Sequence, residues 1–354
     1  MDAALANLRE RIVAANKTRT PLRLRGAGTK DFYGEALAGE ILDTREHAGI
    51  VNYEPSELVI TARCGTPLSE IERALAAQGQ FLPFEPPAFG GDPTIGGVAA
   101  AGLSGPRRAS AGALRDFVLG VALLDAQGEL LYFGGQVMKN VAGFDVSRLL
   151  CGSLGVLGLI AEVSLKVLPR PRVETTLRFE CSAAQAFEHC NRWRAQALPI
   201  SATSWYAGSL CVRLSGSASA LRAARATLGG ETQDAGQAQA WWQDLRDQTH
   251  AFFHHARGAR LWRLSLPATA ALEISGGDLL EWSGALRWLW SDAPASAIRG
   301  VAEKLGGTAT IWRGVRDASM FHPLAPLNLE LHKRLKTQFD PHGIFNRGRL
   351  VAEF

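Results

Sequence analysis

The residues with the clearest chemical potential in this chain are glycines, which gather in three clusters. The first is Gly26-Ala27-Gly28, the second runs from Thr94 to Gly105, and the third from Gly152 to Gly158. Glycine lets a backbone approach a ligand closely, and main-chain N–H groups that converge in such a loop bind phosphate as an anion nest. One cluster alone is better explained by a tight turn in a β-rich domain. Three clusters in one chain favour a nucleotide ligand.

The first cluster departs from the two best-known nucleotide motifs. It follows an alternating run, Pro21 to Arg25, which predicts a short strand and invites comparison with the dinucleotide-binding motif G-x-G-x-x-G. Asp31 stands where the third glycine belongs, and a carboxylate there would repel a pyrophosphate at a helix N-terminus. No G-x-x-x-x-G-K-[ST] sequence occurs either. The loop is therefore predicted to approach phosphate in another way, and a nicotinamide-dependent reductase is a poorer interpretation.

Composition limits the class of protein. The chain has 354 residues, enough for two domains, and its 47% hydrophobic and 20% charged residues are ordinary for a globular protein. The net charge of +4 is small, and no run of lysines and arginines resembles a nucleic-acid-binding arm. The five cysteines contain no C-x-x-C, which argues against a disulfide framework, a zinc site or an iron–sulfur cluster within the chain. No segment is apolar for long enough to span a bilayer, so we expect a cytoplasmic protein, attached to a membrane at most peripherally through a partner.

The spacing of apolar residues predicts the elements that must position these clusters. An amphipathic helix is expected over 1–17, and a second helix is expected to start with Thr66 as its N-cap and to end at Gly79. The expected strands of this first part are 21–25, 40–42, 58–62, 117–124, 130–133 and 160–168. After Pro169 the expected strands are 173–180, 209–214, 261–266 and 309–312, and the expected helices are 183–197, 218–228, 237–254, 295–305 and 328–338.

These elements predict an α+β protein in three parts. Residues 1–170 form the ligand-binding domain, which consists of a β-α-β subdomain with a sheet of its own (about 1–85) and a strand-dominated subdomain (86–170). Residues 171–318 form a second, smaller α+β domain. Residues 319–354 form a C-terminal segment whose turn residues and aromatic Phe345 predict that it docks back onto the first domain.

Taken together, the loops resemble those of one flavoprotein family. The sequences R-G-x-G-T (25–29), D-P-T-I-G-G (92–97) and G-S-x-G-x-L-G-x-I (152–160) occur in the order and spacing of the vanillyl-alcohol oxidase/para-cresol methylhydroxylase family. The ending F-D-P-x-G-I-F-N-x-G-R-L (339–350) is similar to the terminal signature of the FAD-linked oxidase branch of that family. Within it, the chain is most similar to the FAD-binding subunits of bacterial glycolate oxidase (glycolate dehydrogenase). The resemblance implies a two-subdomain FAD-binding domain of the para-cresol methylhydroxylase type, a smaller cap domain that faces the flavin, and FAD as cofactor.

The resemblance also assigns cofactor contacts to the three clusters. Gly102, Ser104 and Gly105 would border the ribityl and isoalloxazine portion, and Gly155 and Ile160 would lie along the adenosine side. The pyrophosphate would be wrapped by Arg25, Gly26, Ala27, Gly28, Thr29, Lys30, Pro93, Thr94, Ile95, Gly96 and Gly97. Asp31 and Asp92 would then have to point away from the phosphates. Some relatives attach flavin covalently through a histidine in the first loop, where this chain has Thr29 and Lys30, so non-covalent FAD is expected.

A flavin enzyme that oxidises a 2-hydroxy acid needs a cation for the substrate carboxylate and a base or metal for the hydroxyl proton, while the cofactor accepts the electrons. The candidate cations are Arg287, Arg313 and Arg347 or Arg349, each of which is otherwise a solvated arginine. Lys139 matches a position where relatives carry a lysine near the flavin. The H-x-G-D-G-N-x-H metal motif of catalytic relatives does not occur, so no metal site is expected.

Two kinds of function remain open. In the first, the chain is an FAD-linked oxidoreductase subunit that oxidises glycolate to glyoxylate and passes electrons towards an iron–sulfur subunit. In the second, it is an FAD-containing electron-relay or assembly subunit, and a sister FAD subunit does the chemistry. A D-lactate-type 2-hydroxy acid dehydrogenase is a further alternative. Because the sequence has neither the metal motif nor an iron–sulfur ligand set, both hypotheses point to partners in a heteromeric complex.

Overall fold

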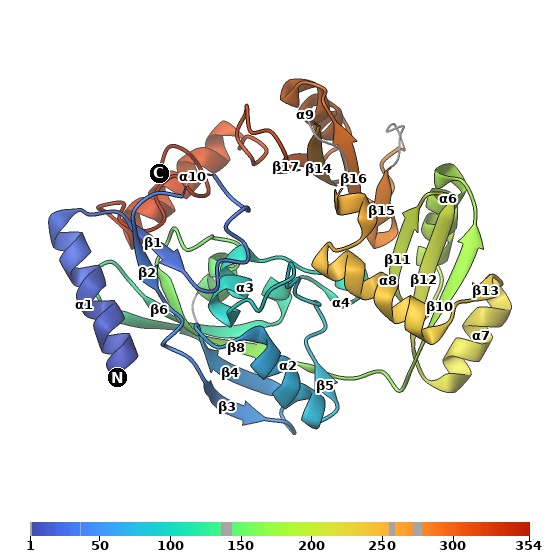
Figure 1. Ribbon diagram of the computed structural model, residues 1–354, viewed down its shortest axis with the longest axis horizontal. Coiled ribbons are helices and arrows are strands. Elements are labelled where there is room, and N and C mark those ends of the chain that lie inside the picture. The colour runs from blue at the N-terminus through green and yellow to red at the C-terminus, as the bar shows by residue number, and fades with distance from the viewer. Residues whose placement is uncertain (1, 36, 136–143, 255–258, 272–277) are drawn as a thin grey trace. The chain divides into compact units, whose positions relative to one another are not determined.

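The structure is a computed structural model, and it describes residues 2–35, 37–135, 144–254, 259–271 and 278–354. The chain separates into two compact units (Figure 1). Unit 1 comprises Met1–Leu103, Ala113–Pro169 and Pro323–Phe354, and unit 2 comprises Ser104–Gly112 and Arg170–His322. The C-terminal segment therefore belongs to the same unit as the glycine-rich loops.

Unit 1 is built around an antiparallel sheet that has, within the described residues, five strands in the order β3-β4-β8-β6-β7. Two short ladders accompany it, β1 parallel to β2 and β5 antiparallel to β9. The helices are α1 (Ala3–Thr18), α2 (Leu68–Ala77), α3 (Ile95–Ala101), α5 (Val146–Leu150) and α10 (Pro326–Phe339). The strands are β1 (Leu22–Arg25), β2 (Glu40–Asp43), β3 (Ile50–Glu54), β4 (Val59–Arg63), β5 (Gln80–Phe81), β6 (Val118–Leu124), β7 (Leu130–Gly134), β8 (Leu159–Lys166) and β9 (Leu168–Pro169).

The amphipathic helix predicted at the start of the chain is confirmed as α1. Asp2 is its N-cap and accepts the N–H of Leu5 at 2.8 Å. Leu5, Leu8 and Ile12 recur at helical spacing and are buried. They pack in one core with the short β1-β2 ladder and the C-terminal segment, through Leu22, Leu42, Ile344 and Phe345.

The predicted separate sheet of residues 1–85 is wrong in part. Strand β4 pairs with β8, which places Ala62 opposite Val163 in one continuous sheet. Because Val59 to Ala62 are all buried, this strand needs a neighbour on each side rather than a place at an edge. The β1-β2 ladder is separate from this sheet, as is the β5-β9 ladder. Strand β3 was not predicted, since most of its side chains are exposed and its apolar pattern is weak.

The predicted N-cap of α2 is also wrong. The residue at that position is Pro67, not Thr66, and it makes no side-chain cap. Thr66 is fully buried. Its Oγ1 accepts the N–H of Gly49 at 2.9 Å and lies 2.7 Å from the carbonyl oxygen of Arg63. The hydroxyl therefore satisfies backbone groups at the ends of β3 and β4 instead of the helix.

Unit 2 is an antiparallel sheet in the order β13-β10-β12-β11-β15-β16-β14-β17 within the described residues. Its strands are β10 (Val173–Glu180), β11 (Ile200–Tyr206), β12 (Ser209–Gly216), β13 (Glu231–Thr232), β14 (Arg260–Ser265), β15 (Leu279–Glu281), β16 (Leu286–Ser291) and β17 (Thr308–Arg313). Its helices are α4 (Arg108–Ala111), α6 (Ala183–Arg194), α7 (Ala218–Leu228), α8 (Ala235–Asp247) and α9 (Ala295–Lys304).

The helix predicted over 237–254 ends earlier, at Asp247. Gln248 adopts a left-handed conformation with φ 56°, and a short 3-10 turn, Ala251–His254, follows. The buried Gln248 side chain accepts a hydrogen bond from Trp312 Nε1 at 2.7 Å. A tertiary contact with β17 thus decides where the helix stops. None of the helices in the described chain combines the length and apolar character needed to cross a bilayer.

Candidate cofactor-binding site

A cavity in unit 1 is walled by segments that lie far apart in the sequence. The walls are the end of β1 with the loop after it (23–31), the first turns of α3 with the residues before them (93–101), and the turn into β8 (154–160). Asn346 and Arg349 of the C-terminal segment complete the wall. The space between these walls, counted to its open mouth, is about 920 Å³.

The first wall offers backbone donors. Among the described residues, no acceptor pairs with the N–H groups of Gly26, Ala27, Gly28 and Thr29. Gly28 has a φ of +74°, and a Cβ there would lie 2.2 Å from Nη2 of Arg25. Successive amides of this kind at a cavity wall form a nest that suits a phosphate group.

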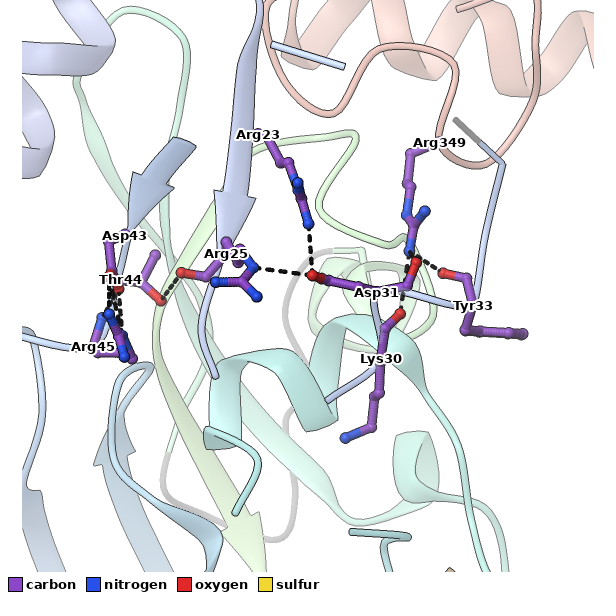
Figure 2. A network of polar contacts seen from close by, with 9 residues as sticks. All are labelled: Arg23, Arg25, Lys30, Asp31, Tyr33, Asp43, Thr44, Arg45 and Arg349. Carbon is purple, nitrogen blue, oxygen red and sulfur yellow. Dashed lines mark hydrogen bonds and ion pairs between the residues drawn. The ribbon is translucent and has the colours of Figure 1, made fainter. Parts of the chain in front are cut away.

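The carboxylate of Asp31 lies in the same wall between two arginines (Figure 2). Its Oδ2 accepts hydrogen bonds from Arg23 Nη2 at 2.6 Å and from Arg25 Nε at 3.0 Å. The orientation of Asp31 relative to the phosphates stays a prediction. Two guanidinium groups outweigh its charge, so the three side chains together remain cationic. Asp92 is not part of the cavity wall, and it accepts the backbone N–H and the hydroxyl of Ser69 at 3.0 and 2.6 Å.

The second wall is the start of α3. Thr94 is the N-cap, and its Oγ1 accepts the N–H of Gly97 at 3.4 Å. A Cβ added to Gly26 would lie 2.1 Å from this Oγ1, and one added to Gly96 would lie 2.6 Å from the Cβ of Cys64. These glycines therefore bring segments of the protein against one another, which is a different role from access to a ligand.

The third wall is joined to the first by the C-terminal segment. Leu154 and Gly155 both have positive φ, 52° and 72°, at the turn into β8. Asn346 Oδ1 accepts the N–H of Leu24 at 2.7 Å, and its Nδ2 donates to the carbonyl oxygen of Leu154 at 2.6 Å. The guanidinium of Arg349 donates to backbone carbonyl groups just after the first loop (Figure 2).

The comparison with known proteins shows which cofactor the protein uses. Residues 4–134 match the family described as "FAD binding domain". Over 347 residues the chain is 47% identical to glycolate oxidase subunit GlcE of Escherichia coli strain K12, and the match covers 98% of this chain and 97% of that protein. The chain belongs to the GlcE family. FAD as the cofactor and the FAD-linked oxidoreductase class are thereby confirmed.

Two further relatives match only part of this chain. Glycolate oxidase subunit GlcD of Bacillus subtilis strain 168 is 31% identical over 47% of this chain and 36% of its own length. A D-lactate dehydrogenase of Anaerostipes hadrus is 29% identical over 44% of this chain and 33% of its own length. Among solved structures, an alkyldihydroxyacetonephosphate synthase superposes with a TM-score of 0.66 at 14% identity, over 98% of this chain and 76% of that one. This likeness confirms the para-cresol methylhydroxylase-type fold.

One part of the cavity wall is cationic and rich in backbone amides, and other parts are apolar, so they would suit different portions of FAD. Backbone amides and a net cationic group lie along the loop after β1, where a diphosphate would be held without lysines. Apolar side chains such as Leu24, Leu154 and Ile160 line other parts of the cavity. Cys64 also lies in the wall, and burial raises the pKa of its thiol to about 12, so it is a neutral group. The residues present therefore fit a dinucleotide.

Most of the residues that the sequence assigned to FAD do lie in the cavity wall. They are Arg25, Gly26, Ala27, Gly28, Thr29, Lys30, Pro93, Thr94, Gly96, Gly97, Gly155 and Ile160. Ile95, Gly102, Ser104 and Gly105 do not line it. Ile95 is fully buried, and Gly102 ends α3 with a φ of 65°, where a Cβ would lie 2.9 Å from the backbone of Gly152. Ser104 and Gly105 belong to unit 2, where Gly105 O accepts the indole N–H of Trp282.

Arg287, a predicted substrate cation, lies in unit 2 and is not part of the cavity wall. Its side chain is buried, and its Nε, Nη1 and Nη2 donate to the carbonyl oxygens of Gly284, Ala271 and Ala270 at 3.0, 2.7 and 2.6 Å. With every guanidinium nitrogen used in this way, Arg287 stabilises the chain segment before β15. Burial also lowers its pKa, although nearby Asp278 opposes this.

The other predicted cations lie in different places. Arg347 is exposed, donates to the carbonyl oxygens of Gly343 and His342, and is not part of the cavity wall. Arg313 is in unit 2, partly buried, and donates to Gln248 Oε1 at 3.1 Å; burial lowers its pKa. Lys139 lies outside the described residues. Within the described chain, no cluster of three or more histidine, cysteine, aspartate or glutamate residues could hold a metal.

The cofactor contacts predicted from the sequence do not include Arg23, Asn346 and Arg349, which line the cavity. Arg23 and Arg25 alternate with leucines on β1, so the strand pattern placed both side chains on one face and could have included Arg23. Asn346 and Arg349 lay in the recognised terminal signature, but no local pattern indicates which cavity a C-terminal residue reaches.

Proposed function

We propose that this chain is the FAD-bearing subunit of a complex that oxidises glycolate, or a closely related 2-hydroxy acid, to the 2-oxo acid. The observation that carries the proposal is the 47% identity to Escherichia coli glycolate oxidase subunit GlcE over almost the full length of both chains. In this proposal FAD is bound without a covalent bond, because Thr29 and Lys30 offer no histidine in the loop after β1.

FAD would supply the acceptor for the two electrons that leave the hydroxyl-bearing carbon. The chain's own part is to hold the cofactor. The amides of residues 26–29 would bind the diphosphate, with Arg23 and Arg25 compensating its charge around Asp31. The glycine contacts at residues 26 and 96 keep the loops close together, which favours a pre-formed site.

A second candidate function is supported by the position of Arg287. A substrate carboxylate needs an accessible arginine, whereas Arg287 is 1% exposed and each of its three side-chain nitrogens donates to a backbone carbonyl oxygen. This favours an electron-relay subunit, in which a sister FAD subunit oxidises the substrate. In both versions we propose a heteromeric complex in the cytoplasm, with an iron–sulfur subunit as the electron acceptor.

An anaerobic visible spectrum of the purified chain tests the proposal. Before substrate is added, the expected spectrum is that of an oxidised flavin. Bleaching on addition of glycolate would identify this chain as the site of oxidation. A spectrum that changes only after the partner subunits are added would identify a relay. Faster bleaching with D-lactate than with glycolate would change the substrate assignment.

A chain that shows no flavin spectrum, even after incubation with excess FAD, would contradict the proposed function. Precipitation with acid tests the attachment separately. The cofactor is expected in the supernatant, and flavin that remains with the precipitated polypeptide would contradict non-covalent binding.

A further inference from the structure

Asn346 and Arg349 of the C-terminal residues Lys336–Arg349 line the cavity proposed to bind FAD, and this segment, which begins in the last turn of α10, lies near β1 (Figure 1). Leu22 and Phe345 form a parallel bridge. The N–H of Leu22 donates to the carbonyl oxygen of Ile344 at 2.7 Å, and the N–H of Asn346 donates to that of Leu22 at 2.9 Å. Strand β1 is thus hydrogen-bonded to β2 on one side and to the C-terminal segment on the other. Ile344 and Phe345 are fully buried in the core that also contains α1.

Asn346 connects two walls of the cavity. Its backbone has a φ of 40°, a left-handed conformation that asparagine adopts more readily than most residues. The side-chain amide accepts from Leu24 and donates to Leu154, and both of these residues line the cavity. Gly155 leaves room for it, since a Cβ there would lie 2.8 Å from Asn346 Nδ2. The two walls therefore keep a fixed separation only while Asn346 is in place.

Arg349 fixes the loop after β1 from its other end. Its Nη1 donates to the carbonyl oxygen of Glu35 at 2.7 Å, and its Nη2 donates to those of Asp31 at 2.9 Å, Lys30 at 3.1 Å and Tyr33. These carbonyl groups follow directly after the unpaired amides of residues 26–29. The loop that carries the phosphate donors cannot open without breaking these hydrogen bonds.

A buried ion pair holds the segment in place. Lys336 Nζ lies 2.7 Å from Asp340 Oδ2 and also donates to the carbonyl oxygens of Val156 and Phe345 at 2.7 and 2.9 Å. Asp340 accepts the N–H groups of Ile344 and Phe345 at 2.9 and 2.8 Å. The pair therefore ties α10 both to the turn before β8 and to the residues that pair with β1.

We propose that Lys336–Arg349 is a clasp on the FAD site, in which Asn346 and Arg349 are positioning residues that hold the first and third walls at the spacing FAD requires. This inference depends on the proposed function, which places FAD in the cavity, and adds a role for the C-terminal segment. Binding free energies are reciprocal, so a clasp that tightens FAD binding by some factor is itself stabilised by bound FAD by the same factor. Both directions can be measured without substrate.

The first test is the variant Asn346→Gly, which keeps the left-handed backbone accessible and removes only the bridging amide. With two hydrogen bonds lost, we expect FAD to bind roughly tenfold more weakly and to dissociate correspondingly faster from the full-length chain. The readout is the recovery of flavin fluorescence on dilution, with circular dichroism to show that the variant is folded. Thr337→Ala is the matched control, because its exposed hydroxyl binds only Lys333 O of its own helix, and it should retain the wild-type rate.

The second test uses the wild-type chain and does not depend on a variant that folds. Hydrogen exchange at the amides of Leu22, Leu24 and Asn346 should slow at least several-fold when FAD is added. An unchanged dissociation rate in folded Asn346→Gly, or unchanged exchange at these amides in FAD-bound protein, would overturn the clasp and leave FAD binding intact. A wild-type chain that takes up no FAD would overturn the proposed function, and the clasp with it.

Discussion

A Cβ added to Gly26 would lie 2.1 Å from Oγ1 of Thr94. The two residues belong to different walls of the cavity proposed to bind FAD, since Gly26 follows β1 and Thr94 caps α3. No side chain fits between them, so the loop after β1 rests directly on the capping hydroxyl. The missing side chain at residue 26 therefore sets the spacing of the two loops that are expected to hold the diphosphate.

Gly26→Ala should weaken FAD binding by tenfold or more, because overpacking of this kind typically costs about 1–3 kcal/mol and the loops must separate to relieve it. A fluorescence titration with FAD measures the effect. Gly26→Ala/Thr94→Ala should recover part of the affinity, since the second change removes the clashing oxygen. Gly300→Ala on α9 is the control, as nothing lies within 4 Å of its added Cβ. Equal FAD affinity in Gly26→Ala and wild type would contradict this account of the loops.

Lys336→Met should destabilise the protein by about 3 kcal/mol, because it leaves the charge of Asp340 buried without its partner. The two side chains are only 5% and 0% exposed. Urea unfolding measures the loss. Arg334→Met breaks an ion pair with Glu330 on the same helix, but those side chains are 73% and 54% exposed, so a change of less than about 0.5 kcal/mol is expected. Similar losses in the two variants would show that burial is not what makes the first pair important.

Arg287→Met should lower stability rather than substrate binding. The change leaves three backbone carbonyl oxygens without donors, for which a loss of about 2–4 kcal/mol is reasonable. Unfolding in urea and the KM for glycolate in the assembled complex should be measured together, with the exposed Arg222→Met as control. A raised KM at unchanged stability would restore Arg287 as a substrate cation.

Asp278 should make unit 2 less stable as the pH rises. Burial raises the pKa of this carboxyl to about 6, although Arg287 partly offsets the effect. Between about pH 4 and 6 the folded protein therefore holds a proton that the unfolded chain has released, so stability contributed by the neutral carboxyl is lost as the pH passes 6. Asp278→Asn cannot ionise, and its stability relative to wild type should rise by about 2–3 kcal/mol from pH 4 to 7. The exposed Asp292→Asn should show no such trend, and an equal trend in both would contradict the assignment.

Local chemistry explains why the cofactor loops were recognisable in the sequence. Gly28 and Gly155 have φ values of 74° and 72°, so glycine is favoured at both positions and the motif remains visible. The contacts that were missed or misplaced depend on distant partners. Ser104 and Gly105 continue the glycine-rich stretch, yet they lie in unit 2 because neighbouring Arg107 binds Glu174 and Ser215.

The burial of charged side chains could not be predicted from the sequence either. Nothing in the sequence around Arg287 indicates that its guanidinium faces backbone carbonyl groups instead of water, since an arginine in a strand is usually exposed. The same holds for the buried Lys336, since Arg334 on the same helix is exposed. Only the packed fold distinguishes these cations from solvated ones.

The hydrogen bond between Leu24 and Asn346 joins residues 322 positions apart. At ordinary rates of translation, about 5–20 residues per second, the ribosome adds Asn346 roughly 20–60 s after Leu24. During that interval the growing polypeptide has β1 but not its second pairing partner, and the cavity lacks the wall that Asn346 and Arg349 supply. The complete cavity therefore forms only after Arg349 has been added to the chain.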